Sequence, residues 1–243
     1  MDSVSCHLVR GLPSVREGDD LAAMIEERFP LLEGDVVCIA STIVSKSEGR
    51  FRELEECSPS ARAEEIAERL DKDPRFVQAV LDESEEVLID WPFLLVATNF
   101  GHIGVNAGID RSNVGQGRIL LLPENPQTSA DQIRRGLQKD CAVIVTDTCG
   151  RPFRCGVAGV AIGWSGIAAL RDWRGERDLA GRELEITLEA IVDEIAGMAN
   201  LLMGEAGGGT PVVVVRGLEL PGSGGRIFRP KELDVIRDRL QKR

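Results

Sequence analysis

The chain has 243 residues, of which 40 are acidic and 29 basic, for a net charge of −11 at pH 7. Only 4% of the residues are aromatic and none is Tyr, so the basic surface and the stacking rings typical of nucleic-acid binding are missing. A hydrophobic content of 43% is ample for the buried core of one large domain or two small ones.

The cysteines and histidines restrict the chemistry further. The 6 cysteines form no C-x-x-C pair, which argues against a zinc or thioredoxin-type site. His7 and His102 are the only histidines, too few for a His-rich zinc site. A metal would therefore need oxygen ligands, as Mg²⁺ and Mn²⁺ do. Without a signal-peptide pattern or a bilayer-length apolar run, we expect a cytoplasmic protein with no membrane partner.

Runs of Val, Ile and Leu predict strands, and apolar residues at helical spacing predict helices. In chain order, the predicted elements are a helix at 20–28, a strand at 35–40, helices at 60–70 and 75–87, strands at 94–98 and 118–122, a helix at 130–138, strands at 141–146 and 156–162, a helix at 182–203, a strand at 212–216 and a helix at 231–241.

These elements do not alternate strictly, so a doubly wound sheet is not favoured. The chain also has neither a G-x-x-x-x-G-K-[ST] loop nor a G-x-G-x-x-G fingerprint, which disfavours a P-loop or Rossmann fold. We expect an α+β protein with mixed sheets and helices, built as two interlaced lobes whose boundaries the sequence does not define.

A hydrophobic run that stops at an Asp-bearing polar turn occurs twice, at residues 105–113 and 144–154. A displayed carboxylate is the ligand that a hard cation prefers where phosphate chemistry takes place. Asp110 and Asp147 are therefore candidate metal ligands of a nucleotide-dependent enzyme. Either can instead be a turn former whose side chain binds its own backbone.

Two further segments are candidates for phosphate contacts. Ser41, Thr42 and Lys46 follow the strand at 35–40 and offer hydroxyl and ammonium donors to an anion, although Lys46 alone can be a solvated surface residue. The glycine-rich run at 204–210 can bring backbone amides close to an anion. It can equally be a helix cap followed by a turn.

Ordered motifs connect these candidates, at residues 10–13, 41–50, 105–113, 146–154, 200–205 and 215–217. In order and spacing they resemble the coenzyme F420-0:γ-glutamyl ligases, enzymes of deazaflavin coenzyme biosynthesis, over nearly the whole chain. The resemblance implies that residues 1–243 form one catalytic unit. It implies a GTP-dependent ligase that couples L-glutamate to the lactyl carboxylate of F420-0 through an acyl phosphate and then adds a second, γ-linked glutamate.

The resemblance also implies a homodimer with two Mg²⁺ or Mn²⁺ ions per site, and K⁺ as a further candidate ion. It makes Asp110, Asp147 and Lys46 the catalytic residues, with Asp110 and Asp147 on one ion and Thr148 and Glu205 on the other. The GTP contacts that it implies are Leu12, Pro13, Ser14, Val15, Ser41, Thr42, Lys46, Asn113, Met203, Gly204, Glu205, Ala206, Gly207, Gly208, Gly209 and Thr210.

Two arginines lie beside one of the candidate metal carboxylates. Arg151 and Arg154 can pair with substrate phosphate or glutamate carboxylate, or can form a structural salt bridge. Cys149, within the same motif, is interpreted as a packing residue because no activating group adjoins it.

The chain ends without the flavin-reductase extension of some bacterial relatives, so ligation is its only expected activity. Two other classes stay open: another Mg²⁺- or Mn²⁺-dependent enzyme, such as a phosphohydrolase or nucleotidyltransferase, and a nucleotide-binding protein without turnover.

Overall fold

The main body of the protein is a mixed β-sheet, seen in a computed structural model that describes residues 3–112 and 114–241. Its strands lie in the order β1-β12-β2-β8-β9. β2 and β8 are parallel, and the other neighbouring strands are antiparallel. The strands are β1 (Ser5–Leu8), β2 (Val36–Ala40), β8 (Ala142–Arg151), β9 (Arg154–Ser165) and β12 (Val212–Arg216).

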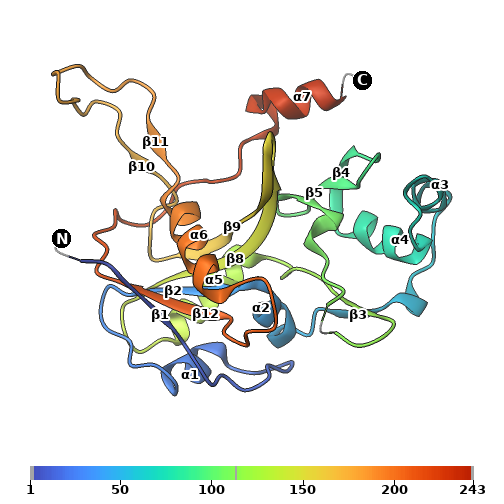
Figure 1. The fold of residues 1–243 in the computed structure, drawn as a ribbon, viewed down its shortest axis with the longest axis horizontal. Coiled ribbons are helices and arrows are strands. Elements are labelled where there is room, and N and C mark those ends of the chain that lie inside the picture. Colours follow the sequence, from blue (N-terminus) through green and yellow to red (C-terminus); the bar gives the residue numbers. More distant parts are fainter. Residues whose placement is uncertain (1–2, 113, 242–243) are drawn as a thin grey trace.

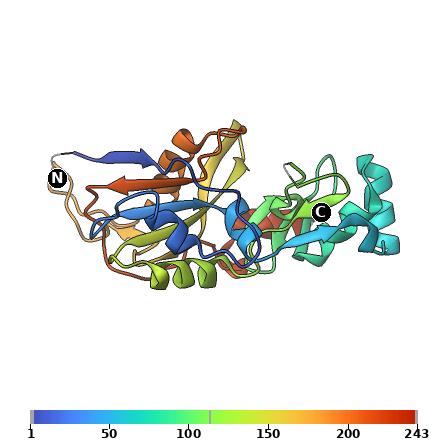
Figure 2. The same cartoon turned by 90° about the horizontal axis from the view of Figure 1, so that it is seen from below.

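Helices cover both faces of this sheet (Figure 2). On one face, α1 (Leu21–Glu26) and α5 (Pro126–Gly136) enclose the first half of the core, and on the other α6 (Ile191–Met203) encloses the second half. A strand covered on both faces needs apolar residues at every position, which explains the unbroken valines of β12. The short helix α2 (Ser41–Ser47) continues directly from the end of β2.

A small lobe, residues 51–121, is inserted between α2 and α5 and has its own hydrophobic core (Figure 1). At its neck, the backbone N–H of Leu121 donates to the carbonyl of Arg50 at 3.0 Å, so the chain leaves and re-enters the body at one place. The lobe contains β3 (Phe51–Glu53), η1 (Leu54–Glu56), α3 (Ala61–Leu70), α4 (Pro74–Asp82), β4 (Ser84–Ile89), β5 (Leu95–Thr98), β6 (Ile103–Val105), η2 (Asn106–Gly108) and β7 (Arg118–Leu120).

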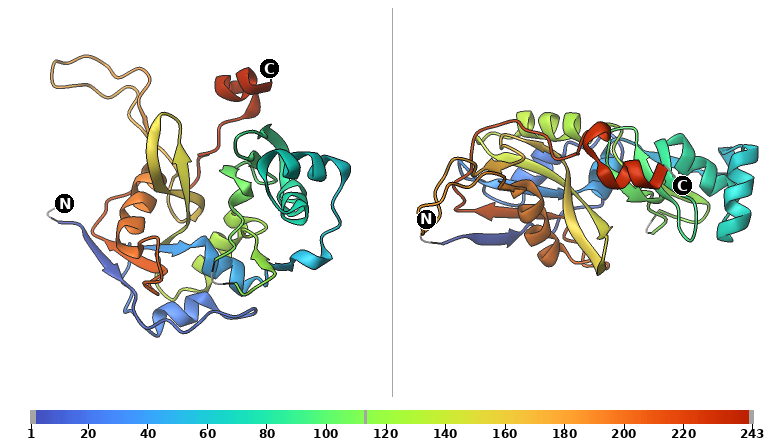
Figure 3. Two further views of the ribbon diagram at one scale, coloured as in Figure 1. Left: turned by 45° about the vertical axis from the view of Figure 1, so that its right-hand side comes forward. Right: turned by 90° about the horizontal axis from the view of Figure 1, so that it is seen from above.

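The C-terminal segment returns from the body to the small lobe, where η3 (Lys231–Leu233) and α7 (Val235–Gln241) lie across β4 (Figure 3). The buried Arg237 donates from Nε to Glu86 Oε2 at 2.7 Å, and Lys231 Nζ lies 3.1 Å from the same oxygen. Burial alone would raise the pKa of Glu86, but these two partners lower it overall. The two lobes are therefore interlaced along the chain.

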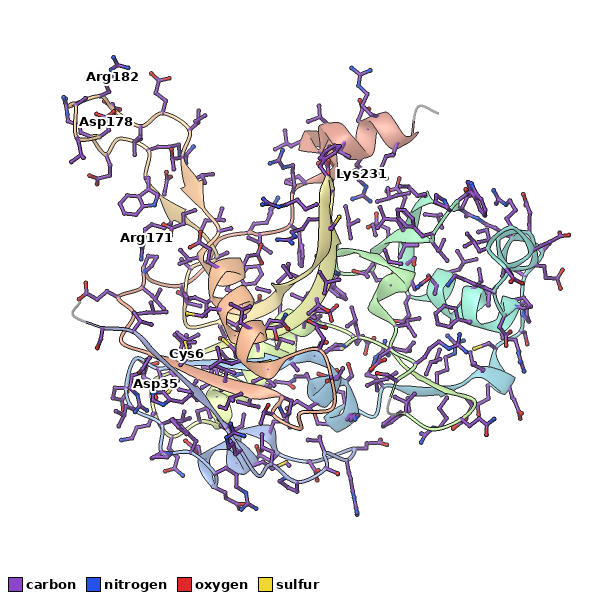
Figure 4. All side chains as sticks on the ribbon, viewed as in Figure 1. Cys6, Asp35, Arg171, Asp178, Arg182 and Lys231 are labelled. Carbon is purple, nitrogen blue, oxygen red and sulfur yellow. The ribbon has the colours of Figure 1, made fainter. Side chains whose placement is uncertain are left out.

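A long arm projects from the body between β9 and α6. Its base is the antiparallel pair β10 (Arg171–Asp172) and β11 (Leu188–Glu189), and Asp178 and Arg182 lie at its far end (Figure 4). The side chains of Leu179 and Ile186 on this arm are exposed.

The predicted α+β class is confirmed, but four predicted helices differ markedly from the structure. The helix predicted at 130–138 is α5, which begins at Pro126, after its cap Asn125, and ends at Gly136. The helix predicted at 75–87 is α4, which Asp73 caps through its 2.9 Å bond to the N–H of Arg75 and which ends at Asp82. The residues that follow form β4, since the β-branched Val87 and Ile89 pair with β5.

The helix predicted at 182–203 begins only at Ile191, because residues 182–190 return along the arm and pair with its first half. Leu184 and Leu188 therefore lie on the arm and not in α6. The helix predicted at 231–241 is interrupted at Asp234, whose carboxylate accepts hydrogen bonds from the N–H groups of Ile236 and Arg237 at 3.0 and 3.1 Å. Within the described residues, no helix is both long and apolar enough to cross a membrane.

His102 gives the small lobe an acid-sensitive core. Its ring is 6% exposed and stacks on Phe100 at 6.3 Å between centroids, and burial lowers its pKa from 6.5 to about 4. The folded protein thus takes up this proton less readily than the unfolded chain. The stability that depends on neutral His102 is complete above pH 6.5 and is lost as the pH falls toward 4.

We expect His102→Phe, which keeps a stacked ring and removes the titration, to reduce the loss of unfolding free energy over this pH range by up to about 3 kcal/mol. Urea unfolding of both proteins at several pH values measures the difference. The same pH dependence in the variant as in the unmodified protein would contradict this role of His102.

Candidate functional site

Asp147 lies in the extended strand β8, and not in the turn that the sequence predicted. β8 continues to Arg151 because each residue from 143 to 151 finds a partner in β9, with two register shifts. The carboxylate is half-buried, and Ser41 at the start of α2 donates a hydrogen bond to its Oδ1 at 3.3 Å. The parallel pairing of β2 with β8 brings these two distant residues together.

The turn at residues 106–108 lies against this carboxylate. Asn106, Ala107 and Gly108 have φ angles of 53°, 54° and 67°, a left-handed run that is unfavourable for Asn and strained for Ala. A Cβ on Gly108 would lie 3.2 Å from Asp147 Oδ2 and 2.6 Å from the side chain of Leu122. The close approach of the turn to Asp147 therefore requires glycine at position 108.

Asp110 follows this turn and is held by hydrogen bonds to Leu120 and Ser112. Its backbone forms a reciprocal pair of 2.9 Å hydrogen bonds with Leu120, and its Oδ1 accepts a 2.6 Å hydrogen bond from the N–H of Ser112. One carboxylate oxygen of Asp110 therefore has the role of a turn former, binding the nearby backbone. Its charge nevertheless acts on Asp147, so the two predicted metal ligands lie within electrostatic reach of each other.

The pKa of Asp147 is raised from 3.8 to about 6. Burial is the largest cause, and the negative charges of Glu205 and Asp110 add to it, whereas hydrogen bonds from Thr148 and Ser41 lower it. Carboxylates from three separate parts of the chain therefore act on one another around Asp147. A bound cation would relieve this repulsion.

The oxygen donors of this site fit a hard divalent ion. Among the residues that the structure describes, no three His, Cys, Asp or Glu side chains close around one point. Mg²⁺ does not need such a cage, because one or two carboxylates with substrate phosphates and water complete its shell. Asp110 and Asp147 can supply those carboxylates.

The other predicted nucleotide contacts surround the end of β2. Thr42 and Lys46 lie on α2, a helix that the sequence analysis did not predict, and both are half-buried. Lys46 forms no ion pair within the ranges that the structure describes. In the segment before α1, Leu12 and Val15 pack against the core while Pro13 and Ser14 are exposed. Asn113 lies outside the described residues.

The loop at 203–210 begins with a helix cap, which is one of the two alternatives that its glycines offered. Met203 is the buried last residue of α6, and the N–H of Gly204 caps the helix through a 2.9 Å bond to the carbonyl of Asn200. Asn200 Nδ2 also holds Glu205 Oε1 at 2.9 Å. The rest of the loop is exposed up to the half-buried Thr210 and comprises Ala206, Gly207, Gly208 and Gly209.

Arg151 and Arg154 face each other at the exposed tip of the β8–β9 hairpin. The four steps along the strand from Asp147 to Arg151 span about 13 Å. Neither arginine forms a salt bridge with the residues that the structure describes, which leaves the structural alternative unsupported. Burial raises the pKa of the nearby Cys149 thiol, in keeping with a packing role.

The structure also contains two cavities that the sequence did not predict. One of about 840 Å³ lies between the N-terminus of α5, the end of β9 and residues 223–228, and one of about 580 Å³ lies between the body and the small lobe. The sequence signal for the first is a second glycine run, at 222–225. The second cavity depends on how the two lobes pack against each other, which no local sequence pattern indicates.

Comparison with known proteins identifies a family and several close relatives in sequence. The F420-0:Gamma-glutamyl ligase family model matches residues 11–217. The chain is 57% identical over 242 residues to the coenzyme F420:L-glutamate ligase of Halorubrum lacusprofundi, covering 96% of each chain. The corresponding ligase of Archaeoglobus fulgidus is 56% identical over 240 residues, with 96% of each covered. That of Methanosarcina mazei is 48% identical over 241 residues, covering 96% of this chain and 95% of its own.

These matches make the protein a ligase that forms carbon–nitrogen bonds. The chain belongs to the F420-0:gamma-glutamyl ligase family.

Proposed function

We propose that the protein couples L-glutamate to the lactyl carboxylate of F420-0 with GTP as co-substrate, and then joins the amine of a second glutamate to the γ-carboxylate of the first. The observation that supports this most directly is the convergence of Asp110, Asp147 and Glu205 beside Ser41. The names of the relatives give the acceptor and the amino acid, and the sequence motifs suggest GTP.

A carboxylate must be activated before an amine can displace one of its oxygens. In the proposed first step, a carboxylate oxygen attacks the γ-phosphorus of GTP, the bond to the bridging oxygen breaks, and GDP leaves. The amine nitrogen of glutamate then attacks the acyl carbon, the bond to the phosphate oxygen breaks, and inorganic phosphate leaves. The amine releases its proton to solvent, so each amide consumes one GTP.

The residues around β2 and β8 suit the first of these steps. Thr42 and Lys46 would bind the GTP phosphates with the loop at 203–210, while Ser41 orients Asp147. Mg²⁺ or Mn²⁺ held by Asp110 and Asp147, with a second ion at Thr148 and Glu205 and K⁺ as a further candidate, would neutralise the phosphate charge. The net charge of −11 gives the protein no favourable overall field for phosphates.

The product distinguishes this function from its alternatives. The purified protein is incubated with GTP, Mn²⁺, F420-0 and L-glutamate, and with each component omitted in turn, while GDP release and product mass are measured. A mass gain of one or two glutamyl residues, with GDP formed only when both substrates are present, is expected. Unconditional GTP hydrolysis would instead indicate a phosphohydrolase, and GTP binding without turnover a regulatory protein.

Lys46→Ala tests the nucleotide contact. Loss of a charge-assisted hydrogen bond costs about 1.5–3 kcal/mol, so the KM for GTP should rise about ten- to a hundredfold. Lys139→Ala, at an exposed position with a 3.8 Å contact to Glu33, is the matched control and should leave KM unchanged. If both variants keep the unmodified GTP dependence, Lys46 is a surface residue without a nucleotide role.

We also infer that the protein is a homodimer. The apolar Leu179 and Ile186 on the projecting arm are exposed, and a second copy would bury them. Light scattering should give twice the chain mass, and replacing both residues with Ser should shift the mass toward the monomer. A monomeric mass at full activity in the unmodified protein would refute the dimer.

A further inference from the structure

The chain that follows β12 is first fixed to the body. Its side chains Leu218, Leu220 and Ile227 pack against the core on the α6 side of the sheet. The carbonyl of Gly224 accepts a 2.7 Å hydrogen bond from the N–H of Ala169, a residue just after β9. We call residues 217–241 the C-terminal strap. Its first part therefore moves with the body.

The middle of the strap meets the small lobe at the turn between β5 and β6. The ring centroid of Phe228 lies 6.2 Å from that of Phe100 and 6.0 Å from that of His102. Phe100 also packs against the core on the α5 side of the body, so strap, body and small lobe meet at this ring. The larger cavity lies beside this contact, and its lining includes Phe100, Asn125 and Arg226.

The end of the strap closes on one carboxylate of β4. Glu86 is 15% exposed and accepts hydrogen bonds from Nε and Nη2 of Arg237, and Lys231 Nζ lies 3.1 Å from the same oxygen. Arg237 is only 6% exposed, and a charge buried to this degree needs its partner. Loss of this pair should therefore release α7 from β4. Figure 1 shows α7 above β4, on the side of the small lobe away from β3.

The small lobe is also attached at its neck, where Arg50 joins the two chain crossings. Its carbonyl accepts from the N–H of Leu121 and its Nε donates to the carbonyl of Leu122, both at 3.0 Å, while its Nη2 lies 2.7 Å from Glu83. Arg50, Glu83 and Leu122 also line the cavity of about 580 Å³ between the lobes, so packing beside the neck is open. Two chain crossings at one place make a hinge.

Rotation about this hinge would separate the candidate metal ligands. Asp110 belongs to the small lobe, whose Gly108 lies so close to Asp147 that a Cβ would be 3.2 Å from Oδ2. Thr42 and Lys46, the proposed phosphate contacts, belong to the body. A rotated lobe would take Asp110 away from Asp147 and leave the phosphate contacts in place. Displacements of about 1 Å at a reacting site can cost about a hundredfold in rate.

We propose that the C-terminal strap holds the small lobe closed on the body, and that Arg237 is thereby a positioning residue for Asp110. When Arg237 binds Glu86, the strap attaches the lobe on the side opposite its hinge, and Asp110 faces Asp147. When the pair is broken, the lobe turns about its neck and the site opens. The inference rests on the proposed function, which supplies the reaction that is measured.

Arg237→Met tests the strap, because Met keeps an unbranched apolar side chain in the buried position and removes the hydrogen bonds to Glu86. We expect kcat to fall about tenfold or more. The KM for GTP should change by less than about threefold, since its contacts lie on the body. Arg237→Lys keeps the charge and should recover most of kcat. Arg69→Ala, which removes a 2.9 Å ion pair to Asp90 within the small lobe, is the matched control and should keep kcat.

A double variant tests whether Arg237 acts through Asp110. Residues that act on one function through each other show non-additive effects. In an Asp110→Asn background, Arg237→Met should therefore lower kcat by much less than it does alone. The same proportional loss in both backgrounds would overturn the proposal, as would an equal rise in the KM for GTP, which indicates a general structural effect.

Hydrogen exchange followed by mass spectrometry measures the strap without turnover. The N–H groups of Thr98 and Gly101 form bonds of 2.8 and 2.9 Å within the turn that Phe228 covers. These amides should exchange faster in Arg237→Met and at the unmodified rate in Arg69→Ala. Exchange or kcat equal to that of the unmodified protein in Arg237→Met overturns the proposal. If the unmodified protein forms no glutamylated product, the proposed function fails, and the exchange rates alone decide whether the strap holds the lobe.

Discussion

Replacing Asp147 with Asn is expected to reduce kcat/KM by more than about 100-fold, because a divalent ion would lose a full negative charge from its shell. The same substitution should leave the metal-free fold intact. Since the pKa of Asp147 is raised to about 6, its charged form opposes folding, and the stability linked to its protonated form is lost as pH rises through that value. Asp147→Asn should therefore unfold at an equal or higher temperature than the unmodified protein at pH 8.

Asp110→Asn is the companion variant, because Asn can still accept the 2.6 Å hydrogen bond from Ser112. We expect its activity to fall and to recover in part at much higher Mn²⁺. Asp140→Asn, which alters a largely exposed carboxylate, is the control. If either Asn variant has the activity of the unmodified protein at the same metal concentration, the replaced Asp is not a metal ligand. A large loss of stability without metal would instead indicate a structural role for that Asp.

Gly163→Ala is expected to have the largest effect on stability. A Cβ at this position of β9 would lie 2.1 Å from the carbonyl oxygen of Pro126, at the first turn of α5. Neither backbone can move without displacing a buried layer, so the cost should be at least about 3 kcal/mol. For a chain of this size, that corresponds to a melting temperature lower by about 6 °C or more.

Gly150→Ala is the matched control, since a Cβ there meets no atom within 4 Å and the residue has no positive φ. Thermal unfolding followed by circular dichroism should show little change for Gly150→Ala and a large decrease, or insoluble protein, for Gly163→Ala. Similar melting temperatures for the two variants would show that α5 does not pack against β9 this closely in solution.

Local patterns predicted the centre of the fold well. The valine run at 212–216 is β12 with the bounds expected, and the strands around residues 36–40 and 142–146 were also found. Each of these strands is covered on both faces, so its unbroken run of apolar residues is enough to predict it. The stretches at 84–89 and 182–190 were wrong because their structure depends on pairing with β5 and with the arm, which no local periodicity records.

The sequence proposed residues for the candidate site but did not predict how they are arranged. The sequence singled out Asp110 and Asp147 as turn residues, but Asp147 belongs to a strand, and the left-handed turn at 106–108 is what brings the small lobe to it. Phe100, Asn125 and Arg226 carried no motif. Their proximity results from the docking of the C-terminal segment on both lobes, which is a property of the whole chain.

Docking of the C-terminal segment also limits how the two lobes can move. Glu86 and Arg237 are separated by 151 positions in sequence and joined by hydrogen bonds, so these non-covalent contacts close a long loop of chain that runs through both lobes. The entropy cost of closing such a loop grows only with the logarithm of its length. A few polar contacts on one carboxylate can therefore restrain the relative motion of two separately packed cores.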